Sequence, residues 1–388
     1  MKIKKTYLYQ ILLVLFLIRQ LFVERIFWSS GVQRTFLRIG NLCFISIIII
    51  GIFLYLIEMY DSKDYVYYCI IFPIIIGTLF LSYVKIDNFD LLLTVFLVLL
   101  GKNINYLKVV KTYFITMSLI LVFVIIGSHF NITLDWIVTF AYGTGHSLGF
   151  NHPNNLGIMI LSIVASWLYL HPNVKWIIVF VISIFASFVV WKVAAARTSA
   201  ILLLAIPWVV ILIKLMIKFK LQHLLKWEFA IIIFAFIVSF YLMFKVGLRG
   251  SINNFESRFY IPYLLYNQYG INLLGSKIPL VGSYEALLYK VQSIILDNAY
   301  FRVLLINGIL STLIFVGFYA ILIRRAYEYK RYILLIIIML FVIEGFMEQF
   351  FLYAEFNFTI LATFANLTSF KLKDEKYEKK FFGNKRIA

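Results

Sequence analysis

Long apolar runs without a single charge are the feature that most restricts how this chain folds. Five of them reach the roughly 17–25 residues that a helix needs to cross a bilayer: residues 39–57, 65–84, 112–134, 153–174 and 303–323. Backbone groups inside lipid must pair within their own segment, so such runs form helices. Hydrophobic residues make up 63% of the 388 positions. A soluble domain has about 45–50% apolar residues, so we predict an all-α, polytopic membrane helical bundle with about 11–12 transmembrane helices.

The net charge of +18 comes from Lys and Arg spread over short loops and termini. This distribution follows the positive-inside rule and argues against a nucleic-acid partner. Three basic segments are therefore placed in the cytoplasm: residues 214–226, 324–331 and 371–386. Residues 129–152 and 247–299 then lie outside. The orientation of the N-terminal third stays open. Its basic loop, with Arg19, Arg25, Arg34 and Arg38, is external if both the first segment and residues 88–100, which are short for a full crossing, span the membrane. If 88–100 only dips into the membrane, the loop is cytoplasmic, but the basic N-terminus is then on the wrong side.

These assignments divide the chain into four regions. They are an N-terminal transmembrane bundle (1–246), a large external loop (247–299), C-terminal transmembrane helices (300–370) and a basic cytoplasmic tail (371–388). The first segment is kept as a span, because no small-residue cleavage site follows it. Within 332–370 we expect two spans interrupted by Glu344, Glu348 and Glu355. Buried charges cost roughly 2.5–3.5 kcal/mol each on insertion scales, so these should face a wet cavity or the external surface.

The first polar cluster runs from Gly145 to Asn155, just before an expected span on the external side. Asn151 and Pro153 fit the start of a helix, as a side-chain cap and a first-turn residue. Capping does not explain the two histidines. A second interpretation makes His146 and His152 donors on a pocket wall, where the helix N-terminus adds positive potential for an anionic group.

Two arginines in separate segments are candidates for binding phosphate. Arg197 opens an expected span among small residues, which lets other helices approach and gives the guanidinium room to point inward rather than to headgroups. Arg258 lies in the external loop beside Glu256, among aromatic residues that suit a helix packed on the membrane surface. A surface ion pair is the simpler interpretation and contributes little. Two converging guanidiniums are what a diphosphate requires, because the planar fork binds phosphate oxygens bidentately.

A third polar group closes the external loop. Asp297 and Asn298 precede the span that begins near Tyr300, and a cap pair at a helix start explains both. As chemistry, Asp297 is a carboxylate at the membrane edge that can orient or deprotonate a sugar hydroxyl if burial raises its pKa. Arg302, about one turn further on, would hold that carboxylate in place.

Other motif classes are absent from the sequence. It contains no Walker-type glycine loop, no HExxH and no nucleophile elbow. Cys43 and Cys69 lie inside apolar runs and form neither a disulfide framework nor a metal pair. The sequence therefore predicts no cofactor and no metal, so the energy for a reaction has to arrive with the substrate.

Several short motifs occur together along most of the chain. They are Gly145 to Asn155, Arg197-Thr198-Ser199, Ser257-Arg258 with Tyr269-Gly270-Ile271 and Leu274-Gly275, and Asp297-Asn298-Ala299-Tyr300 with Asn307-Gly308-Ile309. This combination resembles the Wzy polysaccharide polymerases, more closely those of Gram-positive exopolysaccharide and capsule clusters. The resemblance implies a glycosyltransferase C type fold, as in the related O-antigen ligases, and location in the plasma membrane of a Gram-positive bacterium.

The resemblance also implies a reaction. In a metal-independent, inverting transfer outside the membrane, a glycan on undecaprenyl diphosphate is donated to a hydroxyl of an incoming lipid-linked repeat unit. Arg197 and Arg258 match the ligase arginines that contact the diphosphate. A ligase histidine falls on Asp297, which favours a polymerase, and Asp297, or His152 in its place, would accept the hydroxyl proton. Membrane lipid surrounds the chain, and the expected pathway partners are a flippase and a chain-length regulator.

Three other functions stay open: a ligase-like glycan transferase, a lipid-linked oligosaccharide flippase, and a membrane-embedded sensor or assembly protein. A flippase has little use for a long external loop, and we find no internal repeat of the kind that many transporters carry. A sensor would leave both arginines replaceable. Five tyrosines of the loop are candidates for stacking on sugars, although interface anchoring explains most of them: Tyr260, Tyr263, Tyr266, Tyr269 and Tyr284.

Overall fold

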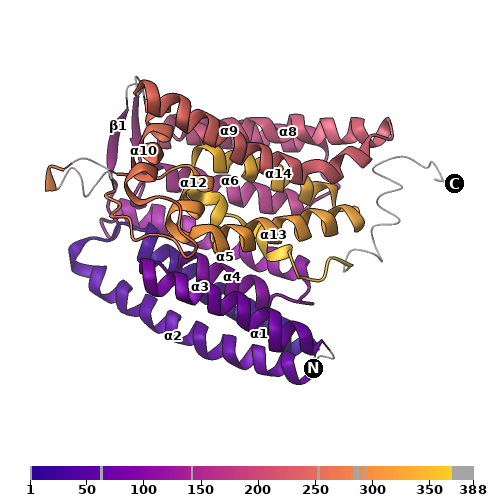
Figure 1. The fold of residues 1–388 in the computed structure, drawn as a ribbon. Coiled ribbons are helices and arrows are strands. Elements are labelled where there is room, and N and C mark those ends of the chain that lie inside the picture. The colour runs from indigo at the N-terminus through magenta and orange to yellow at the C-terminus, as the bar shows by residue number, and fades with distance from the viewer. Residues whose placement is uncertain are drawn as a thin grey trace.

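The computed structural model describes residues 2–61, 64–140, 143–250, 254–282, 289–291 and 294–368. The predicted cytoplasmic tail, 371–388, lies outside the described residues, and so does Tyr284. The described residues form a helical bundle with a two-stranded hairpin at one end (Figure 1). This agrees with the predicted all-α class, to which the hairpin is a small addition.

Helices account for nearly all of the regular structure. In chain order they are α1 (Lys2–Gln20), α2 (Ser30–Asp61), α3 (Phe72–Ile86), α4 (Asp90–Leu100), α5 (Tyr106–His129), α6 (Pro153–Leu170), α7 (Trp176–Val189), α8 (Arg197–Lys218), α9 (Glu228–Arg249), α10 (Asn254–Tyr269), α12 (Ala299–Arg302), α13 (Gly308–Glu328) and α14 (Tyr332–Met347). Strands β1 (Ile137–Phe140) and β2 (Gly143–His146) pair antiparallel, with Ile137 opposite His146. A π-helical turn, Val303–Asn307, joins α12 to α13.

Nine helical segments in the described part of the chain are long and apolar enough to cross a membrane. Each of the five predicted runs overlaps one of them. Their number is below the predicted value of about 11–12, because α4 and α14 are apolar but shorter than a full crossing. Large apolar side chains such as Ile49 and Phe185 are more than half exposed on the outer faces, as contact with lipid requires. The chain is therefore a multi-pass membrane protein.

The loop that contains Arg25 lies at the same end of the bundle as residues 149–151. Phe27 N donates to Gly149 O at 2.9 Å, and Asn151 N donates to Arg25 O at 2.8 Å. The hairpin and α10 are at this end too, opposite the N-terminus (Figure 1). We name it the external end, and the opposite one the cytoplasmic end, after the topology predicted from the charge distribution. The first segment therefore crosses the bundle, which resolves the open orientation of the N-terminal third relative to the rest.

The segment after α14 differs from the prediction of a second span. Residues 348–367 contain only short 3-10 turns, Gln349–Leu352 and Phe358–Ala362, yet nearly all of them are buried. Irregular backbone at membrane depth is tolerated only where protein surrounds it and its polar groups find partners. The apolar composition of this segment thus reflects burial in protein rather than a helix in lipid.

Side chains from other helices supply those partners. Tyr113 OH donates to Glu355 O at 2.8 Å and Tyr106 OH donates to Phe358 O at 3.3 Å. Near the cytoplasmic end, Arg325 donates to Thr363 O and Ala365 O. Arg325 therefore holds the segment in place, a role beyond the topological one expected from the positive-inside rule.

Replacing Arg325 by methionine should destabilise the protein by about 2–6 kcal/mol, because two buried carbonyls lose a charged donor at roughly 1–3 kcal/mol each. Thermal unfolding of the purified protein in detergent measures the loss. Arg324→Met is the matched control, since Arg324 is exposed and its ion pair, within the described residues, is with Glu328 one helical turn away. Equal melting temperatures for the two variants would contradict this role of Arg325.

The external loop is anchored by two glycine-containing motifs that contact each other. Ser276 N donates to Ile306 O at 3.0 Å, and Leu310 N donates to Leu273 O at 3.1 Å. Gly275 has a φ of +84° and Gly308 a φ of +89°. A Cβ on Gly275 would overlap the Ile306 carbonyl, and one on Gly308 would overlap the backbone of Gly275. Only glycine fits at this crossing.

Candidate functional site

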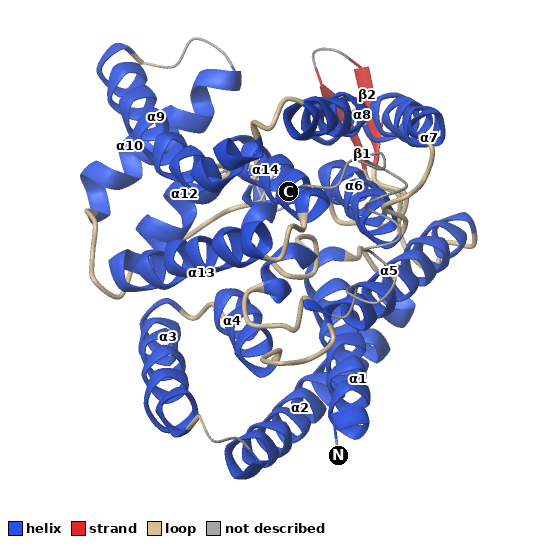
Figure 2. Ribbon diagram, turned by 90° about the vertical axis from the view of Figure 1, so that its right-hand side faces the viewer, coloured by secondary structure: helices blue, strands red, loops and turns tan. Residues whose placement is uncertain are grey.

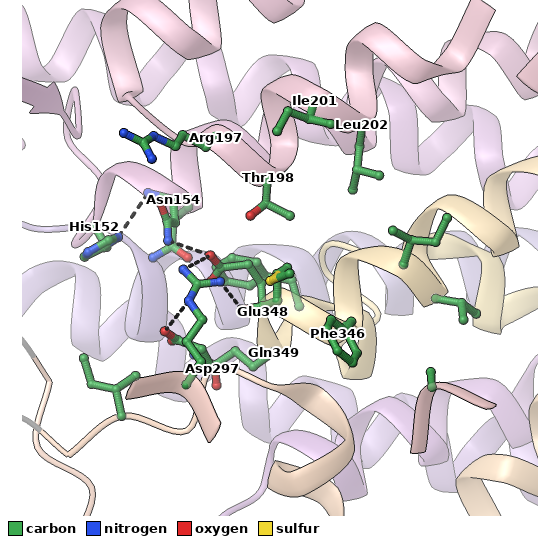
Figure 3. Close-up of a pocket in the computed structure, with 18 of the residues that line it drawn as sticks. His152, Asn154, Arg197, Thr198, Ile201, Leu202, Asp297, Phe346, Glu348 and Gln349 are labelled. Carbon is green, nitrogen blue, oxygen red and sulfur yellow. Dashed lines mark hydrogen bonds and ion pairs between the residues drawn. The ribbon is translucent and has the colours of Figure 1, made fainter. Parts of the chain in front are cut away.

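A cavity of about 1280 Å³ lies at the external end, lined by residues of α6, α8, α9, α10 and α14 (Figure 3). Figure 2 shows these five helices in the upper half of the view. Its wall includes Arg197, Arg258 and Asp297, so the structure brings three predicted site residues from distant parts of the sequence to one cavity. His152 and Asn151 line it as well. His146, Asn298 and Arg302 do not appear in its wall.

The cavity has a polar part and an apolar part. The polar wall is formed by Arg25, Asn151, His152, Asn154, Asn155, Arg197, Thr198, Ser257, Arg258, Asp297, Glu348 and Gln349. The apolar wall comes from α8, α9 and α14, through Ile201, Leu202, Ile231, Phe234, Ala235, Val238, Val342, Ile343 and Phe346. Phe234 is 63% exposed and Ile201 57% exposed, so this part opens on the outer surface of the bundle. Such a cavity suits a ligand with a polar head and a hydrocarbon chain.

Arg258 is held by acceptors on two sides. Its Nη2 lies 3.1 Å from Glu348 Oε1 and its Nε lies 3.8 Å from Asp297 Oδ2, while Nη1 donates to Met347 O at 2.5 Å. The side chain comes from α10, which confirms the predicted helix in the external loop. Glu256, the neighbour expected in a surface ion pair, instead contacts Arg249. Arg258 is thus an oriented guanidinium in a cavity wall.

Arg197 is the first residue of α8. The close approach of α6 explains its position, because a Cβ on Gly157 would overlap the Cβ of Ala196 and crowd Ser199. The small residues before and after Arg197 therefore let two helices pack closely, as predicted, and the arginine lines the cavity at their edge. In Figure 3, Arg197 lies on one side of Glu348 and Asp297 lies on the other.

His152 rather than Asn151 caps α6. Its Nδ1 accepts a hydrogen bond from Asn154 N at 3.1 Å, with Pro153 at the first helical position. The acceptor role of Nδ1 assigns the ring proton to Nε2. Burial, aided by the charge of Arg258, lowers the pKa of His152 to about 4. The imidazole is therefore neutral at pH 7 and acts as a donor through Nε2.

The remaining residues of the first polar cluster have structural contacts. Asn151 Nδ2 donates to Glu24 O at 2.7 Å, which ties this loop to the π-helical turn after α1. His146 lies in β2 with its Nδ1 2.6 Å from Asp135 Oδ2. Asp135 Oδ1 also accepts from Leu148 N at 2.8 Å. The Asp135 carboxylate thus orients the hairpin and holds His146 outside the cavity wall.

Asp297 and Asn298 have separate roles. Asn298 is fully buried and caps α12, with its side-chain oxygen accepting from Tyr300 N and Phe301 N, which agrees with the capping interpretation. Asp297 lines the cavity and is partly exposed. Burial raises its pKa, while the charges of Arg258 and Arg302 oppose that rise. Arg302 itself donates to Tyr353 OH at 2.6 Å.

No known family, curated protein or solved structure matches this chain. Its function is therefore argued from the site. Among the described residues, no group of three or more His, Cys, Asp or Glu side chains is arranged to hold a metal ion.

Glu348 is the main site residue that the sequence did not identify. Its Oε1 accepts from Asn154 Nδ2 at 3.0 Å and from Arg258 Nη2 at 3.1 Å. The expectation that charged residues after position 332 face a wet cavity is confirmed for Glu348 and wrong for Glu344 and Glu355, which are fully buried. The signal for Glu348 was its charge in an apolar context, but its partners lie on distant segments.

Arg25 is a second unpredicted residue of the wall. Its Nη2 lies 3.0 Å from Glu355 Oε1, and its guanidinium lies over the rings of Tyr353 and Phe356. The ion pair and the flanking rings offset part of the cost of burying the Glu355 carboxylate. Arg25 therefore joins the N-terminal helices to the buried C-terminal segment at the edge of the cavity.

Proposed function

We propose that this protein is a membrane polysaccharide polymerase. It joins undecaprenyl-diphosphate-linked oligosaccharide repeat units at the external end by metal-independent, inverting glycosyl transfer. The observation that supports this most strongly is the presence of Arg197 and Arg258 in the polar wall of one cavity whose other wall is apolar. Guanidiniums bind phosphate oxygens bidentately and keep their charge. We also propose that the bundle is of the glycosyltransferase C type.

The apolar wall between α8, α9 and α14 fits the polyprenyl chain. Ile231 lies in the first turn of α9 and Val238 two turns further on, so this wall extends for about 10 Å along the helix. A diphosphate between the arginines would send its hydrocarbon chain along this wall, whose exposed side chains open it to lipid. The polar residues around His152 and Asn154 would face the sugars.

Chemically, the arginines act on the leaving group. As the bond between the donor sugar and the diphosphate breaks, negative charge grows on the departing oxygen. Fixed guanidiniums stabilise that charge more in the transition state than in the ground state, which accelerates the reaction. His152 is neutral and presents Nε2–H, so it would donate to a sugar or phosphate oxygen rather than accept a proton.

A reconstituted reaction tests this function. Purified protein in liposomes, supplied with one lipid-diphosphate-linked repeat unit and EDTA, should produce a ladder of longer glycans on lipid, with an inverted linkage by NMR. Strict dependence on a divalent ion would contradict the metal-free mechanism. Transfer only to a different acceptor would indicate a ligase. Movement of the substrate between leaflets with no new glycosidic bond would indicate a flippase.

A further inference from the structure

We propose that Glu348 accepts the proton of the attacking sugar hydroxyl. This inference rests on the proposed function and identifies the base of the same site. The sequence pointed instead to Asp297 or His152. In the step, the hydroxyl oxygen bonds to the anomeric carbon of the donor, the bond from that carbon to the diphosphate oxygen breaks with its electron pair, and the hydroxyl proton moves to the Glu348 carboxylate. The proton is later released to water.

The geometry of Glu348 fits a base better than that of the other candidates. The carboxylate is fixed from two sides, by Asn154 of α6 and Arg258 of α10, and both donors contact the same oxygen, Oε1. Neither of these two hydrogen bonds uses Oε2, and we assign this second oxygen to the hydroxyl. In Figure 3, Glu348 lies between Thr198 and Asp297, in the middle of the polar wall.

His152 is excluded as a base by its hydrogen bond. Its Nδ1 already accepts a hydrogen bond from Asn154 N, and its Nε2 already carries the ring proton. Neither ring nitrogen can therefore accept the hydroxyl proton while this hydrogen bond is kept. Its low pKa agrees, because an imidazole with a pKa of about 4 is a weak base. Its ring is further fixed by the edge of Trp136, with ring centroids 5.6 Å apart.

The surroundings of Glu348 adjust its basicity. The charged and titratable groups around it are His152 before α6, Arg197 on α8, Arg258 on α10, Asp297 before α12 and Glu344 on α14. Burial raises the pKa of Glu348 to about 7, with Asp297 adding to the rise and Arg258 opposing it. A carboxylate with a pKa near the working pH is a better proton acceptor than an ordinary one.

Arg258 links substrate binding to this base. In the free protein its Nη2 contacts Glu348, which stabilises the carboxylate as an ion and weakens its basicity. A bound diphosphate competes for the same guanidinium. The carboxylate then loses part of its ion pair next to a new negative charge, so its affinity for a proton increases when both substrates are present.

The test compares Glu348→Gln with the wild type in the reconstituted reaction between pH 5 and 9. Gln keeps the shape of the side chain and an oxygen that accepts from Asn154 and Arg258, so folding and lipid binding are preserved. We expect kcat to fall by about 10²–10⁴-fold, the usual contribution of a general base. KM should change by less than about threefold. The wild-type rate should fall on the acid side of an apparent pKa near 7, and the variant should lose that dependence.

Asp297→Asn separates the two carboxylates. Removing the negative charge of Asp297 makes the ionised form of Glu348 easier to reach. The fall in rate on the acid side of the pH profile (the acid limb) should therefore move to lower pH and persist. Loss of the limb in this variant, with the limb kept in Glu348→Gln, would assign the base to Asp297 and overturn the proposal.

Glu328→Gln, the same change at an exposed cytoplasmic site, is the control. A wild type that makes no glycosidic bond would overturn the proposed function and this step together, whereas active wild type and equally active Glu348→Gln would overturn this step alone.

Discussion

Arg258→Met should stop chain growth almost completely. Loss of one fixed donor to a developing oxyanion costs about 10²–10³-fold in kcat. The true loss should be larger, because the substitution also leaves Asp297 and Glu348 without the cation that both contact. In a host cell, single repeat units should accumulate on lipid outside the membrane while long polymer disappears. Gel analysis of the polymer and mass spectrometry of the lipid-linked pool measure both effects.

Two further variants define the cause. Arg258→Lys keeps a positive charge but loses the planar fork, so it should recover only a small part of the activity. Arg324→Met removes an exposed arginine at the opposite end of the bundle and should leave polymer length unchanged. Polymer of normal length in both Arg258 variants would contradict the assignment of this arginine to the diphosphate.

Gly275→Ala should destabilise the protein strongly. The substitution requires a non-glycine residue at a φ of +84° and places a Cβ inside the Ile306 carbonyl. A residue in such a backbone conformation costs about 1–3 kcal/mol, and the overlap adds to it because backbone must move. Since residues 272–276 anchor the loop that carries Arg258 and Asp297, activity should fall with the melting temperature. Differential scanning fluorimetry and the reconstituted reaction measure the two losses.

Gly270→Ala is the matched control for this experiment. Gly270 also has a positive φ, +66°, but a Cβ built there meets nothing within 4 Å. Gly270→Ala should therefore lose only the stability that the positive φ costs a non-glycine residue, about 1 kcal/mol. Equal losses at Gly270 and Gly275 would show that the contact between the two glycine motifs contributes nothing beyond backbone conformation.

The sequence predicts the transmembrane helices well because length and apolarity alone decide them. The same reasoning fails for residues 348–367, which are also largely apolar but contain Glu348 and Glu355. There the chain is irregular because Tyr106, Tyr113 and Arg325, on distant helices, satisfy its carbonyls. No local pattern contains those partners.

Part of the site is also visible in the sequence. Arg197, Arg258 and Asp297, which are assigned to one site from the sequence, line the same cavity. Glu348 and Arg25 are visible in the sequence only as charged residues, because their roles depend on contacts across the fold with Arg258 and Glu355. The cap of α6 was assigned one residue early, since His152 is an unusual cap and Asn151 a common one.

A structure of the protein with bound undecaprenyl diphosphate tests the central claim most directly. We expect both phosphates between Arg197 and Arg258, with guanidinium nitrogens about 3 Å from phosphate oxygens, and the hydrocarbon chain along α8, α9 and α14. A diphosphate bound at another place, or contacting only one of these arginines while the other faces away, would contradict the account.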